Sequence, residues 1–207
     1  MSWQKVTYGA ALKNICWNKD VKQKSEVTGG QVKIEREIKM IKDLKSQNPN
    51  IDKDTFVAET AVVIGDVFIG GGSSLWYGAV VRGDINHITI GASTNVQDNS
   101  TLHVDMDASL KIGNYTSIGH NSIVHGCTVG DNCLIGMGAI IMSGATVGDN
   151  CIIAAGTIVT GKTSIPPNSM VMGIPGKVIR QLGQDEIQAI RNTADRYEKL
   201  WRSKYKP

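Results

Sequence analysis

The most regular feature of the chain is an aliphatic residue at every sixth position. Twenty such residues keep this register between residues 51 and 171, with spacings of nine, ten and five residues at three breaks. They are Ile51, Val57, Val63, Ile69, Leu75, Val81, Ile90, Val96, Leu102, Ile112, Ile118, Val124, Val129, Ile135, Ile141, Val147, Ile153, Val159, Ile165 and Val171. A period of six fits neither an α-helix nor a simple alternating strand. The pattern predicts a repeat architecture in which every hexad adds the same small unit.

Small residues recur around these aliphatic positions. Gly directly follows many of them, as in Ile69-Gly70 and Ile118-Gly119, and the pentapeptide VGDNC occurs twice, starting at Val129 and again three hexads later at Val147. Gly tolerates the backbone conformations that tight corners require. Each hexad is therefore expected to form one short strand and a turn, and three hexads to form one triangular coil. The sequence predicts an all-β solenoid whose aliphatic side chains point into a common core.

The repeat divides the chain into three segments. Residues 49–176 form the expected solenoid. Residues 1–48 are an N-terminal extension, either a cap on the first coil or a leader, and within it residues 31–38 are expected to form a strand. Residues 177–207 are a C-terminal segment. Its apolar residues at three- and four-residue spacing predict an amphipathic helix over 184–205 that packs along one face of the solenoid.

Charge is distributed unevenly between these segments. Lys and Arg outnumber Asp and Glu by ten to five in residues 1–48 and by eight to four in residues 177–207, whereas the middle has four against ten. An acidic middle argues against a nucleic-acid-binding protein, and no apolar run approaches the roughly 20 residues of a membrane span. The cysteines are Cys16, Cys127, Cys133 and Cys151. Their wide spacing favours free thiols and, without a signal-like apolar N-terminus, a cytoplasmic protein.

Three of the four histidines form a candidate metal site. His103 and His125 each directly follow an inward aliphatic residue, and they lie 22 positions apart. The long spacing after Leu102 loops out four residues, which leaves a separation of three hexads, or one coil. We therefore expect the two imidazoles to stack on one edge of neighbouring coils, about 4.8 Å apart at the backbone, where they can share a metal. His120 is expected on another face, so a neighbouring subunit would supply it; His87 is interpreted as a surface or loop residue.

Four ordered motifs surround these histidines: Arg82-x-Asp84, Asn95-x-Gln97-Asp98, Leu102-His103 and His120-x4-His125. Over about residues 50–180 the chain resembles the gamma-class carbonic anhydrase family of the hexapeptide-repeat superfamily. The resemblance implies a left-handed parallel β-helix that assembles as a homotrimer. It also implies a Zn²⁺ or Fe²⁺ ion held between subunits by the three histidines, two from one chain and one from its neighbour.

The same resemblance implies roles for further residues. Arg82 and Asp84 match an ion pair between subunits that supports the site. Gln97 matches a residue that hydrogen-bonds the metal-bound water, and Asp98 matches an acid that supports the ligands. The implied reaction is attack of a metal-bound hydroxide on CO2 to give bicarbonate. The expected substrate is a small molecule, with no nucleic acid and no membrane among the partners.

The chain departs from the active members of this family in two places. They have Glu directly after the Arg-x-Asp motif, where this chain has Ile85. They also have an acidic loop after the first His, where this chain has a short insertion with only Asp105 and Asp107. Tyr197, on the expected C-terminal helix, is the candidate replacement in the proton route.

Two other functions remain open from the sequence. A hexapeptide-repeat acyltransferase would take an acyl-CoA donor and use a His as general base. The segment Gly173–Arg180 is found in both groups and does not discriminate between them. Three histidines at ligand spacing fit an acyltransferase less well, because one base suffices. The third alternative is a catalytically silent, metal-binding trimer, which the missing Glu favours.

Overall fold

The computed structural model describes residues 22–28, 31–37, 40–44 and 47–205. These residues fall into two units, the second of which begins at Met40. The first is a hairpin in which β1 (Lys22–Thr28) pairs antiparallel with β2 (Gln31–Glu37). The strand expected after the Gly29-Gly30 turn is thus present as β2. Cys16 lies outside the described residues, and the capping role stays a prediction.

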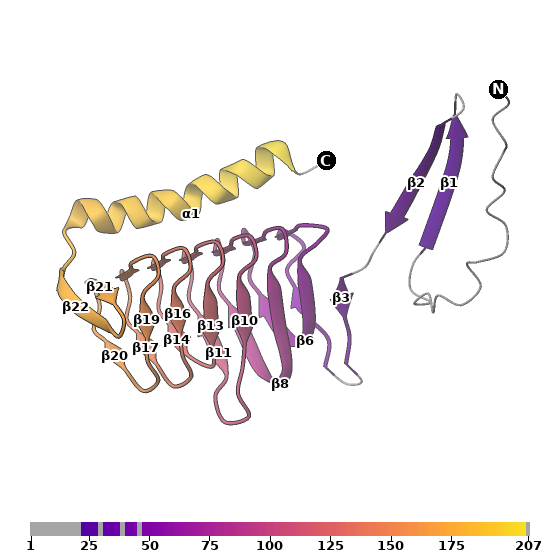
Figure 1. The fold of residues 1–207 in the computed structure, drawn as a ribbon. Helices are drawn as coiled ribbons and strands as arrows, with labels where there is room; N and C mark the ends of the chain where they lie inside the picture. Colours follow the sequence, from indigo (N-terminus) through magenta and orange to yellow (C-terminus); the bar gives the residue numbers. More distant parts are fainter. Residues whose placement is uncertain (1–21, 29–30, 38–39, 45–46, 206–207) are drawn as a thin grey trace, which may run out of the picture. The chain divides into compact units, whose positions relative to one another are not determined.

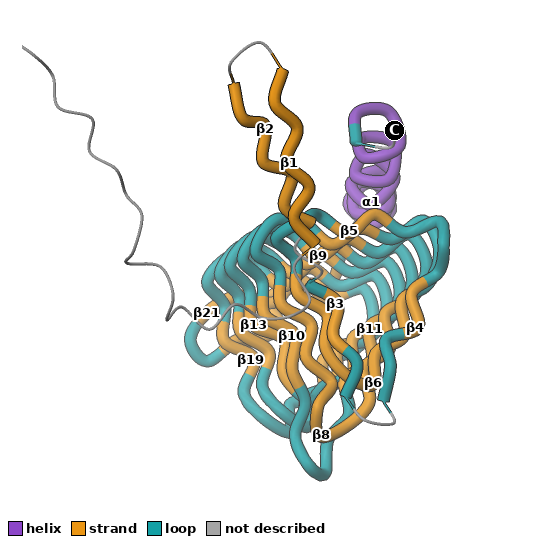
Figure 2. Tube along the Cα trace, turned by 90° about the vertical axis from the view of Figure 1, so that its right-hand side faces the viewer, coloured by secondary structure: helices purple, strands orange, loops and turns teal. Residues whose placement is uncertain are grey.

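The second unit is a left-handed parallel β-solenoid of about seven turns, as the hexads predict (Figure 1). Its strands form three faces, which the tube in Figure 2 shows nearly end-on. Face A consists of β3 (Ile41–Lys42), the first halves of β6 (Val62–Ile69) and β8 (Val80–Ile90), β10 (Thr101–His103), β13 (Ile123–His125), β16 (Ile140–Ile141) and β19 (Ile158–Val159). Face B consists of β4 (Asn50–Ile51), the second halves of β6 and β8, β11 (Leu110–Ile112), β14 (Thr128–Val129), β17 (Thr146–Val147) and β20 (Ser164–Ile165). Face C consists of β5 (Phe56–Val57), β7 (Ser74–Leu75), β9 (Asn95–Val96), β12 (Ser117–Ile118), β15 (Leu134–Ile135), β18 (Ile152–Ile153), β21 (Ser169–Gly173) and β22 (Gly176–Gln181).

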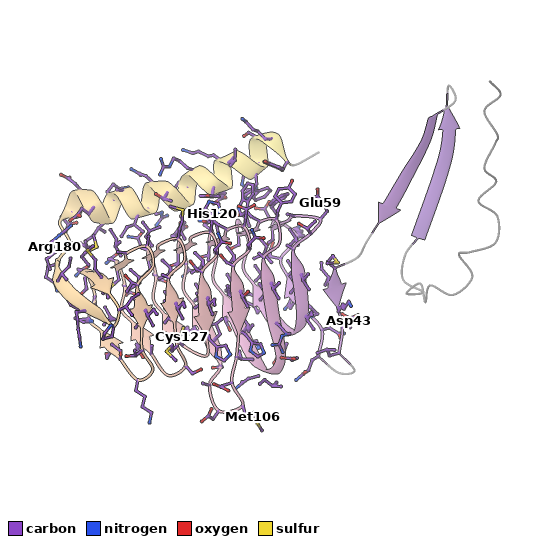
Figure 3. The ribbon with its side chains drawn as sticks, in the orientation of Figure 1. Asp43, Glu59, Met106, His120, Cys127 and Arg180 are labelled. Atoms are coloured by element: carbon purple, nitrogen blue, oxygen red, sulfur yellow. The ribbon has the colours of Figure 1, made fainter. Side chains whose placement is uncertain are left out.

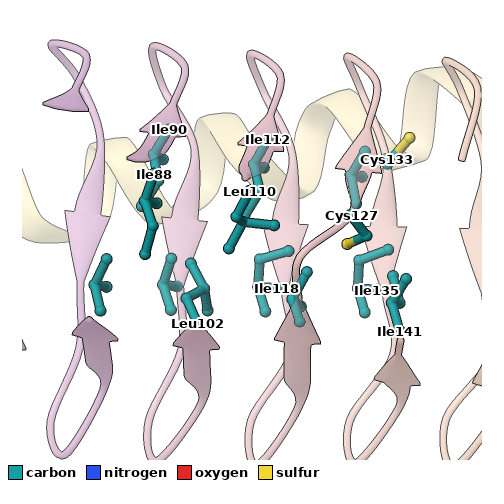
Figure 4. Close-up of a cluster of buried hydrophobic side chains, with 14 of the residues drawn as sticks. Ile88, Ile90, Leu102, Leu110, Ile112, Ile118, Cys127, Cys133, Ile135 and Ile141 are labelled. Atoms are coloured by element: carbon teal, nitrogen blue, oxygen red, sulfur yellow. The ribbon is translucent and has the colours of Figure 1, made fainter. Parts of the chain in front are cut away.

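The core is a set of aliphatic columns that run along the solenoid. Eighteen of the twenty hexad residues are buried, and the remaining two, Ile51 and Val57 in the first coil, are partly buried. Each inward residue stacks on its equivalent one coil later, as Ile118 does on Ile135. Figure 4 shows neighbouring coils repeating this inward packing. Burying methyl groups at every coil supplies the main driving force for the fold.

The corners between faces C and A depend on residues that tolerate positive φ. Gly78 has φ 70°, and a Cβ there would lie 2.3 Å from the Asn99 side-chain oxygen. In the next two coils Asn99 and Asn121 occupy this conformation, with φ of 58° and 57°. Asn is among the few residues with a side chain that visit this region readily. These corners fix the backbone beside Asp98 and His120.

One long helix, α1 (Gln184–Lys204), lies along face C (Figures 1 and 2). It confirms the predicted amphipathic helix and ends one residue earlier than predicted. Trp201 is buried with its ring stacked on Phe56, at 6.3 Å between centroids, and Arg202 pairs with Asp54 of the solenoid. Among the described helical residues, no segment has the length and apolar character to cross a membrane.

Candidate functional site

The register of face A brings Arg82, His103 and His125 into one row. In this row His103 is paired with Arg82 on one side and with His125 on the other. The extra residues between β10 and β11 form a loop closed by a hydrogen bond from the Asp105 amide to the Ala108 carbonyl, at 2.9 Å. Because this loop leaves the coil, the two histidines come to lie one turn apart. The stacking predicted from the spacing is therefore confirmed.

The two imidazoles face each other at the end of face A. Nδ1 of His103 lies 3.0 Å from Nε2 of His125. The other ring nitrogen of His103, Nε2, lies 3.1 Å from Asp84 Oδ1, and the other ring nitrogen of His125, Nδ1, lies 2.9 Å from Ser143 Oγ. Each histidine therefore has one nitrogen turned toward its neighbour and one held by an oxygen.

These partners determine which nitrogens carry hydrogen. The Asp84 carboxylate only accepts hydrogen bonds, so His103 donates from Nε2. Ser143 donates its hydroxyl hydrogen to Asp105 Oδ2 at 2.8 Å, so it accepts the hydrogen of His125 Nδ1. The two facing nitrogens are then unprotonated in the neutral histidines. Their lone pairs point at each other across 3.0 Å, an arrangement that a cation between them stabilises.

This donor set fits a metal ion. Two nitrogens bound to one tetrahedral zinc at about 2.0–2.1 Å lie about 3.3 Å apart. The two facing nitrogens of His103 and His125 lie at a similar distance, 3.0 Å. Hydrogen bonds from the outer ring nitrogens to oxygen are also typical of metal-binding histidines. Within the described part of this single chain, however, no group of three or more His, Cys, Asp or Glu side chains is placed to hold a metal. One chain alone therefore provides the His103–His125 pair without a further ligand.

Asp84 is held in its charged form. Its partial burial opposes ionisation, but hydrogen bonds from Arg82 and His103 outweigh this effect and lower the pKa of the carboxyl below its ordinary value. Arg82 and Asp84 pair within one chain. At neutral pH the Asp84 carboxylate is therefore an acceptor for the His103 ring.

Gln97, Asp98 and His120 form a second cluster at the corner between faces C and A. β9 and β12 pair in register, which places Asp98 beside His120. Nδ1 of His120 lies 2.9 Å from Asp98 Oδ2. Gln97 is nearly buried, and its amide nitrogen donates to Asn95 Oδ1 at 3.0 Å. This corner precedes face A, whereas the His103–His125 pair ends it. The chain thus presents two separate clusters at opposite edges of one face, and Figure 3 shows His120 on the side of α1.

Tyr197 projects from α1 toward the second cluster. Its ring contacts Trp76 at 5.4 Å between centroids. Burial, and then the charge of Asp98, raise the pKa of the Tyr197 phenol. The phenol therefore keeps its proton at neutral pH, and the role of Tyr197 in the proton route stays a prediction.

Three residues near the histidines were missed or misplaced by sequence reasoning. Ser143 lies one position beyond Met142, the residue one coil after His125 in register, so counting coils alone does not place its hydroxyl next to the His125 ring. Asn86 holds the inserted loop by donating to the carbonyl of Asp105 at 3.0 Å. His87, interpreted from the sequence as a surface or loop residue, is half-exposed but lies inside strand β8, where its ring nitrogens contact Asp66 and Thr89, each at 2.8 Å.

A left-handed parallel β-helix built from six-residue repeats defines a hexapeptide-repeat protein. The model of the family "Bacterial transferase hexapeptide (six repeats)" matches residues 109–139 and 126–161. A solved structure, a hexapeptide transferase family protein from Anaplasma phagocytophilum, has a TM-score of 0.75 and 36% sequence identity. That similarity covers 78% of this chain and 96% of the Anaplasma protein.

Two curated relatives narrow the family. A Methanocaldococcus jannaschii protein named "Probable carbonic anhydrase" is 54% identical over 150 residues, which cover 72% of this chain and 94% of that protein. "Gamma carbonic anhydrase 2, mitochondrial" of Arabidopsis thaliana is 42% identical over 160 residues, which cover 74% of this chain and 58% of that protein. The chain belongs to the gamma carbonic anhydrase-like family of hexapeptide-repeat proteins.

Proposed function

We propose that this protein is a metal-dependent, gamma carbonic anhydrase-like enzyme that converts CO2 to bicarbonate. The observation that carries the proposal is the pair of facing nitrogens, His103 Nδ1 and His125 Nε2, 3.0 Å apart and each backed by an oxygen partner on the far side of its ring. The curated relatives named as carbonic anhydrases support the choice of reaction.

The complete site forms between copies of the chain in a homotrimer. In this arrangement the His103–His125 pair of one copy meets the cluster containing Gln97, Asp98 and His120 of the next. The support is positional, because the two clusters lie at opposite edges of face A, where a neighbouring copy can bring them together. Zn²⁺ or Fe²⁺ fits the all-imidazole ligand set.

The chain's own residues would divide the work as follows. His103, His125 and a neighbour's His120 hold the ion, while Asp84 fixes the orientation of His103. A bound zinc ion would lower the pKa of a coordinated water to about 7 and so supply the nucleophile near neutral pH. Gln97 presents an amide that orients this water, and Asp98 fixes the His120 ring. Ile85 has no group that takes up a proton, so proton release goes to solvent or buffer.

Stopped-flow CO2 hydration tests this proposal. The protein is loaded with zinc, or anaerobically with ferrous iron, and compared with the metal-free form and with His120→Ala. We expect a rate that requires metal and is lost in the variant. Metal bound close to one ion per chain without a rate above buffer would contradict the reaction, and would leave a silent metal-binding trimer.

Acyl transfer is the second candidate, favoured by the similarity to a hexapeptide transferase family protein. A partly exposed histidine with a carboxylate partner, such as His103 with Asp84, is a suitable general base. Calorimetric titration with acetyl-CoA separates the two functions. Micromolar binding that survives removal of the metal would favour acyl transfer, whereas a lack of binding would favour CO2 hydration.

A further inference from the structure

A chain of hydrogen bonds connects His125 to the loop that follows His103. Nδ1 of His125 donates to Ser143 Oγ at 2.9 Å, and Ser143 donates in turn to Asp105 Oδ2 at 2.8 Å. The direct separation between His125 Nδ1 and Asp105 Oδ2 is 3.9 Å, too long for a hydrogen bond. Ser143 is therefore the necessary link between the ring and the carboxylate.

The loop is held in the position that this link requires. Asn86 donates its side-chain amide to the carbonyl oxygens of Asp105 and Met106, at 3.0 and 3.3 Å. The loop also closes on itself through the hydrogen bond between Asp105 and Ala108. The three connected side chains come from three successive coils of the solenoid, so the solenoid itself sets their spacing.

The direction of the Ser143 hydrogen bond decides the tautomer of His125. A hydroxyl has one hydrogen, and Asp105 takes it, because a carboxylate only accepts. Ser143 then accepts from Nδ1 of His125, and the opposite nitrogen, Nε2, is left with its lone pair toward His103. Without an acceptor at Nδ1 the ring is free to carry its hydrogen on Nε2 instead, where it cannot bind a metal.

We propose that Asp105, acting through Ser143, is a positioning residue that holds His125 in its metal-binding tautomer, and that it is not a proton shuttle. The proposal rests on the proposed metal site. The two facing rings are thus oriented by two different devices, since Asp84 contacts His103 directly whereas Asp105 acts on His125 through a serine. Asp105, in the loop between β10 and β11, then supports metal binding by orienting His125 and does not release protons.

Zinc affinity, measured by competition with a chromophoric chelator on the folded protein, is the first test. We expect Ser143→Ala and Asp105→Ala each to weaken zinc binding by about 10- to 100-fold. Ser143→Thr keeps the hydroxyl and should restore affinity to near the wild-type value. Asp107→Ala, in the same loop, is the matched control and should bind zinc like the wild type.

Imidazole ¹⁵N NMR of the metal-free protein provides a readout that loss of packing alone would not move. His125 should carry its hydrogen on Nδ1 in the wild type and distribute it over both nitrogens in Ser143→Ala. Zinc affinities of Ser143→Ala and Asp105→Ala within twofold of wild type would overturn the proposal. So would a CO2 hydration defect in Asp105→Ala that added imidazole buffer rescues while zinc affinity is unchanged, because that result identifies a shuttle.

The two proposals fail in distinguishable ways. If wild-type protein does not bind zinc or ferrous iron, the proposed metal site is wrong, and the NMR measurement still tests whether Ser143 sets the tautomer. An unchanged tautomer in Ser143→Ala would contradict the inference whatever the metal result. If metal binds and hydration is absent, the zinc affinities alone decide the role of Asp105.

Discussion

Faces A and B of the solenoid both have aliphatic inward side chains, but their outward side chains are very different. On face A the first outward position of each strand stacks into one column: Val62, Val80, Thr101, Ile123, Ile140 and Ile158. On face B the corresponding column is Phe68, Thr89, Lys111, Thr128, Thr146 and Ser164. Five of six residues are aliphatic on face A, whereas five of six are polar or charged on face B.

The difference shows that the inward and outward positions of a hexad have separate tasks. Inward residues fill the core equally on both faces. They therefore determine the solenoid fold and do not determine what each face contacts. Outward residues decide what each face contacts. Face A leaves Ile123 42% exposed and, at its corners, Met137 60% and Met142 45% exposed. A partly exposed apolar column beside a histidine pair suits contact with another copy, whereas the polar column of face B suits contact with water.

The largest expected effect concerns the proposed metal site at the edge of face A. His103→Ala and His125→Ala each remove a facing nitrogen and should abolish stoichiometric zinc binding, measured by elemental analysis after dialysis. His87→Ala is the matched control, since His87 also has a carboxylate partner but contacts Thr89 of face B. If His87→Ala lost zinc and His125→Ala kept it, the metal site would lie near His87 and the assignment to the His103–His125 pair would be wrong.

The next effect concerns assembly. Ile123→Glu places a charge in the middle of the apolar column and should convert the proposed trimer into monomers, because burying an unpaired carboxylate costs several kcal/mol. Thr128→Glu is the equivalent change on face B and should leave the trimer intact. Analytical ultracentrifugation measures both variants. Equal masses for Ile123→Glu and wild type would show that face A does not form the interface.

The sequence predicted the repeat and the histidine stack because both depend only on backbone period. Counting three hexads per coil pairs His103 with His125, once the looped-out residues are removed. His87 was predicted as a surface or loop residue, and its side chain is indeed half-exposed. The loop alternative is wrong, because the three extra residues before Ile90 are absorbed within strand β8 as a register shift opposite β6. Ser143 was missed because Met142 is the residue one coil after His125 in register, so the hexad count does not bring the Ser143 hydroxyl to the His125 ring.

Face C extends the comparison, because its cover comes from the same chain. Trp201 of α1 is buried against Phe56, and its indole nitrogen donates to the Gly72 carbonyl at 3.4 Å. Trp201→Ala should lower the free energy of unfolding by about 3–5 kcal/mol, as large-to-small changes in packed interiors do. Lys199→Ala, at an exposed position of the same helix, should change it little. Urea unfolding tests both, and equal losses would mean that the helix does not stabilise face C through Trp201.

The smallest expected effect concerns the start of this helix. The hydrogen bonds from Arg180, and then from the Gly183 amide, lower the pKa of Glu186 to about 2. A carboxyl whose folded pKa lies below its ordinary value of 4.5 stabilises the fold above that value, and this contribution is lost as the pH falls toward 2. In Arg180→Gln the free energy of unfolding should therefore decrease less between these two pH values than it does in the wild type. The difference should be small, because the pair is exposed to solvent. Arg196→Gln, an exposed arginine further along α1, should keep the wild-type pH profile; identical profiles for both variants would show that Arg180 does not anchor the helix over face C.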